Sequence, residues 1–117
     1  MILGEPSTNL KYKFCSAQKN GLRGFDKDIV DAVLGEIAFL ADERGYDLYI
    51  SKGVPPDAPR VFFFGHGAWD GMLSHQECED CLGEAHDQLN DFCASYTGGQ
   101  IQLRGCRLRF EEYPFIE

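Results

Sequence analysis

Residues 74–111 read SHQECEDCLGEAHDQLNDFCASYTGGQIQLRGCRLRFE and hold four of the chain's five cysteines. Ser74, followed three residues later by Glu77, is typical of a capping box, in which each side chain accepts a hydrogen bond from a main-chain N–H at the start of a helix. Apolar residues then recur at helical spacing, and these are Cys78, Cys81, Leu82, Ala85, Leu89, Phe92 and Cys93. The stretch therefore predicts an amphipathic helix that begins just after Ser74.

The second half of this stretch predicts two strands. Gly98 and Gly99 predict a turn after the helix. Residues 100–103 and 106–111 then alternate apolar with polar side chains, as half-buried antiparallel strands do.

The residues that precede position 74 supply the rest of the fold. Residues 11–16, 47–51 and 61–65 predict strands, and residues 26–44 predict an amphipathic helix closed by Gly45. Residues 51–60 contain three prolines and predict a hairpin connection. The order β-α-β-β-α-β-β predicts an α+β fold, in which two helices pack against a single five-stranded antiparallel sheet.

The composition limits the kind of protein and the kind of partner. The chain has 117 residues, which is one domain, and 44% of them are hydrophobic, which is enough for a core. Its net charge of −8 argues against binding to nucleic acid or to an anionic membrane surface. It holds no apolar run near the roughly 20 residues that span a bilayer, so we expect no membrane insertion.

The odd number of cysteines means that they cannot all pair within one chain. Cys78 and Cys81 form a C-x2-C pair, but they lie inside the predicted helix and no second such pair follows, which disfavours zinc. A thioredoxin-like dithiol would need a parallel βαβ unit, which the pattern lacks. We therefore expect no metal and no cofactor, and we interpret the cysteines as structural disulfides, a typical feature of proteins from oxidising compartments.

The cysteine spacing resembles a known family. Cys78-x2-Cys81-x11-Cys93-x12-Cys106, followed by Arg107-Leu108-Arg109-Phe110-Glu111 and Pro114-Phe115, resembles the ginkbilobin-like plant cysteine-rich domain, also called the salt stress response/antifungal domain. The resemblance covers residues 12–115, and it predicts a single domain over 1–117. The family hallmark is C-x8-C-x2-C, and its first cysteine is replaced here by Trp69.

The resemblance implies which cysteines pair. Cys15 is expected to bond with Cys93, and Cys81 with Cys106. Cys78 becomes the odd thiol, because Trp69 holds the position of its usual partner. We expect the Trp69 ring to pack against the start of the second helix instead. The leading interpretation of Cys78 is a buried, inert thiol.

The resemblance also implies a candidate carbohydrate site. In antifungal members of the family, mannose is bound by an Asn after the first cysteine, an Arg after the Gly-Gly-type turn, and the Glu of the C-terminal motif. These positions are Ser16, Gln100 and Glu111 here, so only the Glu is kept. The alternative for Glu111 is a solvated strand residue, paired with Arg109 or Arg107 across strands.

The function implied by the resemblance is a non-enzymatic extracellular binding module of plant defence or stress signalling. Family members include small secreted proteins and the ectodomains of cysteine-rich receptor-like kinases and plasmodesmata-located proteins. The partner would be an extracellular protein or a cell-wall, mannose-type glycan. The alternatives are a mannose-binding antifungal lectin and, third, a thiol redox sensor acting through Cys78. Residues 1–14 lack the features of a signal peptide, which fits either a cytosolic protein or the mature chain of a secreted one. The resemblance implies the second, a secreted protein of the apoplast.

One further stretch stands out. The triplet 62–64 is Phe-Phe-Phe, which favours a buried strand over a ligand platform. His66 follows between two glycines, and this setting predicts a place near a surface turn, with a role as metal ligand or general base disfavoured.

Overall fold

The structure, a computed structural model, describes residues 6–19, 24–40, 45–54, 61–94 and 96–117, with the main chain alone at 16–19, 24–26, 54 and 61. The elements follow in the order β1 (Leu10–Lys19), α1 (Gly24–Leu40), β2 (Asp47–Val54), β3 (Val61–Trp69), α2 (His75–Phe92), β4 (Tyr96–Leu103) and β5 (Cys106–Glu111). The predicted order β-α-β-β-α-β-β is confirmed.

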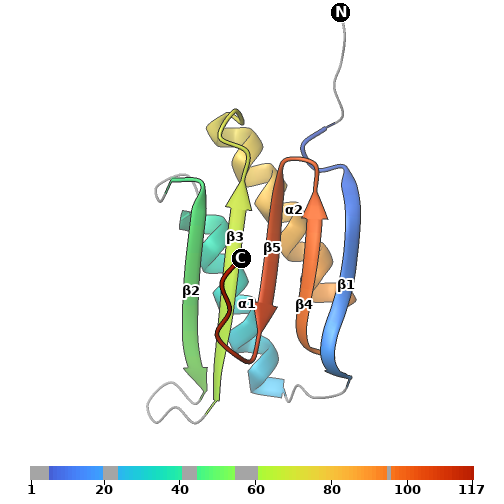
Figure 1. Cartoon of the computed structure of the whole chain (residues 1–117), viewed down its shortest axis with the longest axis vertical. Helices are drawn as coiled ribbons and strands as arrows, with labels where there is room; N and C mark the ends of the chain where they lie inside the picture. Colours follow the sequence, from blue (N-terminus) through green and yellow to red (C-terminus); the bar gives the residue numbers. More distant parts are fainter. Residues whose placement is uncertain (1–5, 20–23, 41–44, 55–60, 95) are drawn as a thin grey trace, which may run out of the picture.

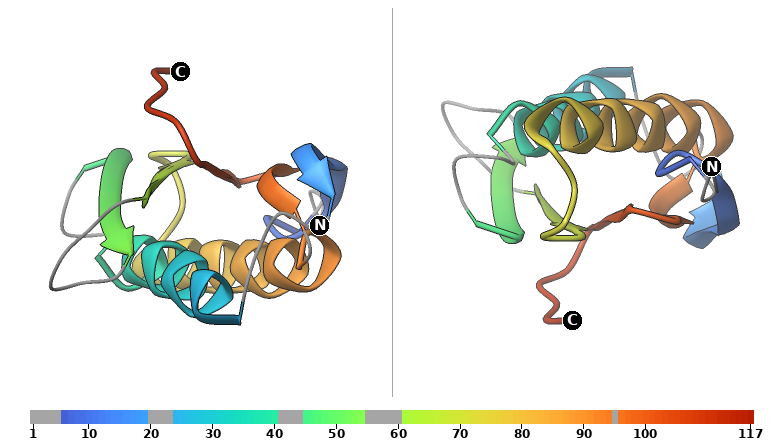
Figure 2. Two further views of the ribbon diagram at one scale, coloured as in Figure 1. Left: turned by 90° about the horizontal axis from the view of Figure 1, so that it is seen from below. Right: turned by 90° about the horizontal axis from the view of Figure 1, so that it is seen from above.

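The five strands form one antiparallel sheet, in the spatial order β1-β4-β5-β3-β2 (Figure 1). Both helices lie side by side on one face of this sheet, and the C-terminus lies on the other face (Figure 2). We call the face away from the helices the open face. Strand side chains alternate between the two faces, so each strand sends every second residue to the open face.

The core lies between the helices and the sheet. The described residues of the two predicted helical stripes are buried or partly buried, apart from Phe92, which is half exposed. Burial of each large apolar side chain contributes roughly 1.5–3 kcal/mol, so this layer is the main source of stability. The buried apolar residues are Val30, Val33, Leu34 and Ile37 of α1; Cys78, Cys81, Leu82, Ala85 and Leu89 of α2; Phe63 and Trp69 of β3; Ile101 and Leu103 of β4; Cys106, Leu108 and Phe110 of β5; and Cys93.

Helix α2 begins where its capping box predicts. The Ser74 hydroxyl accepts a hydrogen bond from the Glu77 main-chain N–H, and the Glu77 carboxylate accepts one from the Ser74 N–H. The bond from the Ser74 N–H, and then the contact with its hydroxyl, lower the pKa of Glu77. The cap satisfies main-chain N–H groups that the first helical turn leaves without partners.

Helix α1 approaches β3 at two glycines. A Cβ atom built at Gly65 would collide with the side chain of Val33 and approach that of Ile37. A Cβ atom built at Gly67 would collide with the side chain of Ile37. Only glycine permits this close approach of the helix to the strand. His66, between these glycines, therefore points to the open face.

Two disulfides hold the ends of α2, as the resemblance implied. Cys15 in β1 bonds with Cys93 at the helix C-cap, and Cys81 bonds with Cys106 at the start of β5. Cys78 belongs to neither disulfide and is buried. The bond between residues 15 and 93 closes a loop of sequence separation 78, which is worth roughly 4 kcal/mol in the chain-entropy model.

The turn predicted at Gly98 and Gly99 is wrong. Both residues lie inside β4, where they pair with Ser16 and Cys15 of β1. A Cβ at position 99 would lie 2.6 Å from the Sγ atom of Cys93. Glycine is needed here because a disulfide passes over the strand.

Other predicted boundaries change by a few residues. The strands predicted at 11–16, 47–51 and 61–65 are longer, and α1 ends at Leu40. Residues 41–44 and 55–60 lie outside the described residues, and with them part of the predicted helix and hairpin connection. The Phe triplet alternates rather than being buried throughout, because Phe63 points into the core while Phe62 is 45% exposed.

Candidate functional site on the open face of the sheet

The middle of the open face carries a row of side chains from all five strands. Tyr49 pairs with His66, His66 with Arg109, Arg109 with Gln100, and Gln100 with Phe14. Cross-strand neighbours in register lie close enough to interact. The row places charged and hydrogen-bonding groups over β3 and β5, and aromatic groups at both ends.

Residues 112–117, which we call the strap, cross this row after β5 ends (Figure 1). The main-chain N–H of Glu117 donates a hydrogen bond to Tyr49 Oη at 2.8 Å. The ring of Phe115 lies 4.2 Å from the guanidinium carbon of Arg109 and contacts the edge of the Tyr49 ring. The strap is therefore attached to both β2 and β5.

His66 is the most deeply buried polar side chain of the row, at 1% exposed. Its Nδ1 lies 2.6 Å from Glu117 Oε1, and its Nε2 contacts Asp47 Oδ1. Its ring stacks on Tyr49, with the ring centroids 4.1 Å apart. The predicted position near a surface turn is wrong, because the flanking glycines serve the packing of α1 and β3 continues through them to Trp69.

The guanidinium of Arg109 makes polar contacts with three side chains. Its Nε donates to Glu111 Oε2 at 2.9 Å, its Nη2 donates to Tyr113 Oη at 3.1 Å, and its Nη1 lies 3.4 Å from Glu117 Oε2. Burial acts to lower the pKa of Arg109, but the hydrogen bond and charge of Glu111, with those of Tyr113 and Glu117, outweigh it. The pKa of Arg109 is therefore raised above its ordinary value, and the guanidinium keeps its charge.

Glu111 is 2% exposed, so the alternative of a solvated strand residue is wrong, although the contact with Arg109 that it included is present. The carboxylate faces Arg109 on the same strand, two residues away, because alternate residues share a face. The Arg109 guanidinium lowers the cost of burying this carboxylate.

The three positions of the candidate carbohydrate site lie on three adjacent strands, β1, β4 and β5. Ser16 pairs with Gly98 and is described by its main chain alone. The Gln100 Nε2 donates to Tyr12 Oη at 3.3 Å, and Gln100 pairs in register with Arg109, the residue that contacts Glu111. Arg109 is therefore the cross-strand neighbour of Gln100 and the ion-pair partner of Glu111.

Aromatic side chains extend the open face along the edge strand β1. Tyr12 and Phe14 stack, with centroids 6.1 Å apart, and they are 44% and 48% exposed. The amide of Gln100 lies beside them through its bond with Tyr12. This end of the open face therefore combines an accessible aromatic surface with a hydrogen-bonding group.

A cavity of about 440 Å³ lies between the strap and strands β2 and β3. Its lining is mostly apolar and includes Tyr49, Phe64, Pro114, Phe115 and Ile116. The strap forms one wall, so the shape of this cavity depends on where the strap lies.

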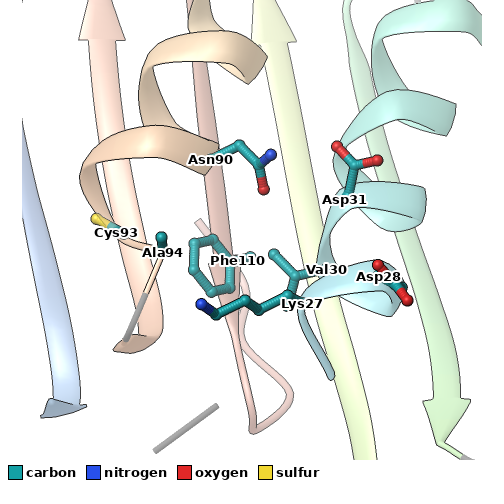
Figure 3. Close-up of a pocket in the computed structure, with 8 residues that line it drawn as sticks. All are labelled: Lys27, Asp28, Val30, Asp31, Asn90, Cys93, Ala94 and Phe110. Carbon is teal, nitrogen blue, oxygen red and sulfur yellow. The ribbon is translucent and has the colours of Figure 1, made fainter. Parts of the chain in front are cut away.

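A smaller crevice, of about 240 Å³, lies on the helical side (Figure 3). In this view, Asn90 of α2 lies above the ring of Phe110, and Lys27 of α1 lies below it. Asp28 and Asp31 line the same crevice, and Asp31 Oδ1 lies 2.7 Å from the His86 ring. Its polar residues lie on exposed helix surfaces.

Trp69 and Cys78 line one cavity of about 390 Å³ near the start of α2. Trp69 is 8% exposed and Cys78 is 3% exposed, and both belong to the core. The buried indole and the Cys78 side chain thus line the same cavity near the start of α2.

Within the residues that the structure describes, no three His, Cys, Asp or Glu side chains are grouped so as to hold a metal ion. None of the helices in the described ranges is long and apolar enough to cross a membrane.

Sequence reasoning missed the residues that surround His66 and Arg109. Asp47, Tyr49 and Glu117 contact His66. Tyr113 and Phe115 contact Arg109. Asp47 and Tyr49 lie on a strand whose register with β3 cannot be derived from periodicity. The strap has no regular secondary structure, so no pattern in residues 112–117 predicts that it folds back.

Known proteins resemble this chain in both sequence and structure. It is 27% identical to antifungal protein ginkbilobin-like protein 1 of Picea sitchensis, over 94% of the chain and 81% of that protein. It is 24% identical to plasmodesmata-located protein 6 of Arabidopsis thaliana, over 90% of the chain but 36% of that protein. No protein-family model matches the chain.

The crystal structure of the tandem DUF26 ectodomain of the Arabidopsis thaliana cysteine-rich receptor-like protein PDLP8 has the same fold, with a TM-score of 0.79 at 23% identity. The match covers 93% of this chain and 51% of that chain, so the protein spans about half of the tandem ectodomain. The homologues are thus ginkbilobin-like antifungal proteins and plasmodesmata-located proteins. The resemblance that the cysteine spacing predicted is confirmed by these relatives in sequence and by this structure in fold, and the chain is similar to the ginkbilobin-like cysteine-rich domains.

Proposed function

We propose that the chain is a non-enzymatic extracellular binding module of plant defence or stress signalling, and that it recognises a protein or carbohydrate partner on the open face. The observation that carries this proposal is the accessible aromatic pair Tyr12 and Phe14, beside the Gln100 amide on the face opposite the helices. Exposed aromatic groups next to a few hydrogen-bonding groups are typical of binding surfaces.

An extracellular location of the protein is supported by the two disulfides, because disulfides persist in oxidising compartments. A binding role, rather than catalysis, is supported by the state of His66. A general base must reach a substrate proton, but both nitrogens of His66 contact carboxylates and its side chain is buried. The relatives named as antifungal proteins and receptor-like ectodomains favour defence or signalling.

The lectin alternative keeps Glu111 and replaces the family's Asn and Arg by Ser16 and Gln100. In the structure, Glu111 is buried against Arg109 and the Gln100 amide is bonded to Tyr12. A sugar would have to replace these contacts, and a polar group left without a partner costs about 1–3 kcal/mol. This favours the general binding module over mannose binding by the family geometry.

The thiol-sensor alternative depends on access to Cys78. A reactive cysteine is partly exposed, whereas Cys78 is 3% exposed within the core. Its burial favours a structural role.

A glycan array probed with the oxidised protein, with mannose as competitor, tests which kind of partner is bound. The lectin alternative predicts mannose-competed binding that Gln100→Ala and Glu111→Gln weaken at least about tenfold, equivalent to about 1.4 kcal/mol. Gln76→Ala, on the exposed surface of α2, is the matched control and leaves binding unchanged. Absence of glycan binding by a folded protein with both disulfides would reject the lectin and direct the search to protein partners.

A further inference from the structure

The imidazole of His66 lies between two carboxylates, one on each nitrogen. Nδ1 lies 2.6 Å from Glu117 of the strap, and Nε2 contacts Asp47 at the start of β2. A neutral imidazole carries one N–H, so it can donate to only one carboxylate, whereas an imidazolium donates to both. The observed pair of contacts is therefore the arrangement that suits a protonated ring.

The charges around His66 lead to the same conclusion. Asp47 and Tyr49 face it from β2, Arg109 faces it from β5, and Glu117 faces it from the strap. Arg109 also contacts Glu111 and Tyr113, so both belong to the same cluster. Helix α1 packs on the other face of β3, through the apolar side chains of Val33 and Ile37.

His66 contacts two carboxylates, those of Asp47 and Glu117, and the guanidinium of Arg109 is shared between Glu117 and the buried carboxylate of Glu111. A neutral His66 leaves the cluster with an excess of negative charge beneath the strap. A protonated His66 supplies the second positive charge and is bonded directly to Glu117. Histidine is also the side chain whose charge ordinarily changes between about pH 5 and 8.

We propose that His66 is a proton-dependent clasp, which fastens the strap to the open face when it is protonated and loosens it when it gives its proton to solvent. On deprotonation one ring nitrogen loses its hydrogen, and the carboxylate that it faced loses a donor. The remaining bond is no longer charge-assisted, and charge-assisted hydrogen bonds are roughly twice as strong as neutral ones. The attachment is therefore present at low pH and weakens as the pH rises.

Loosening of the strap changes two things on the open face. The cavity of about 440 Å³ loses the wall formed by Pro114, Phe115 and Ile116. Arg109 loses its contacts with Tyr113 and Glu117, while Glu111 remains beside it on β5. The clasp does not rest on the proposed function, because it concerns contacts within the chain.

NMR of the oxidised, ¹⁵N-labelled chain between pH 4.5 and 9 tests the clasp. The ring ¹⁵N shifts of His66 report its protonation, and NOEs between Phe115 and Arg109, with the amide shift of Glu117, report strap attachment. We expect both sets to change with one midpoint, and the ratio of attached to detached strap to fall about tenfold across it.

Two variants and a control make the test decisive. His66→Gln should show the loosened strap at every pH, and Glu117→Gln should do the same if the first variant does not fold. His75→Gln, on the exposed start of α2, should behave like the parent. A strap that stays attached while His66 loses its proton, a His66 that does not titrate in this range, or an unchanged pH response in His66→Gln would overturn the proposal.

Discussion

The guanidinium of Arg109 joins Glu111, in the last strand, to Glu117, at the end of the strap. Glu111 is one of the three residues of the candidate carbohydrate site, and Glu117 is the group that contacts His66. A single side chain therefore connects the candidate binding position with the segment that crosses the open face.

Removal of Arg109 should destabilise the fold. Arg109→Gln removes the guanidinium that contacts the Glu111 carboxylate, which is 2% exposed, and breaking a buried ion pair in this way costs roughly 3 kcal/mol. Chemical unfolding at pH 7 measures the loss. Arg104→Gln, whose exposed side chain contacts the Pro6 carbonyl, is the control and should cost less than about 1 kcal/mol. Equal losses in the two variants would show that the buried pair has no special role.

The cysteines should differ sharply in their effect on stability. Cys15→Ser opens a disulfide that closes a loop of sequence separation 78, and the expected loss is about 4 kcal/mol. Cys78→Ala removes only a buried thiol and should cost less than half as much. Denaturant unfolding of both variants, under oxidising conditions, measures the difference. If Cys78→Ala proved as damaging as Cys15→Ser, the disulfide pairing would be wrong.

A third disulfide should form when the family cysteine is restored. Positions 69 and 78 line the same cavity at the start of α2. Trp69→Cys is therefore expected to oxidise fully and to leave no titratable thiol, whereas the parent chain has one, at Cys78. Intact-mass spectrometry after alkylation counts the thiols. Two alkylated thiols in the variant would contradict the alignment of Trp69 with the hallmark cysteine.

Glycine-to-alanine changes at Gly67 in β3 and at Gly83 in α2 should have opposite effects on stability. At Gly67 the new Cβ collides with Ile37 of α1, so Gly67→Ala should destabilise by about 1–3 kcal/mol. At Gly83 nothing lies within 4 Å, so Gly83→Ala in α2 should stabilise by about 0.5–1 kcal/mol. Thermal unfolding of the two variants gives the signs. A neutral Gly67→Ala would mean that α1 does not rest on β3 as described.

Much of the fold could be predicted from local patterns. The capping box at Ser74 and Glu77 set the start of α2, and two stripes of helical period identified the helix faces that are buried. The alternation of apolar and polar side chains in residues 106–111 identified the last strand. These features depend on neighbours within a few residues, which the sequence shows directly.

The errors arose where distant contacts decide the outcome. Two adjacent glycines ordinarily mark a turn, but Gly99 is needed for the passage of the bond between Cys15 and Cys93. Likewise, the glycines around His66 serve the approach of α1 and do not end the strand. The enclosure of His66 by Asp47 and Glu117 depends on strand register and on the path of the strap, which have no local signal.

The measurement that tests the central claim most directly is an NMR titration of the oxidised, ¹⁵N-labelled chain with mannan oligosaccharide, in which amide shifts locate the contact. The open face as the binding surface predicts shifts centred on Tyr12, Phe14 and Gln100, and their loss in Tyr12→Ala but not in Gln76→Ala. Shifts centred on the helical crevice of Lys27 and Asn90 would contradict the claim, because they would place recognition on the opposite side of the sheet. No shifts at all would remove carbohydrate as the partner.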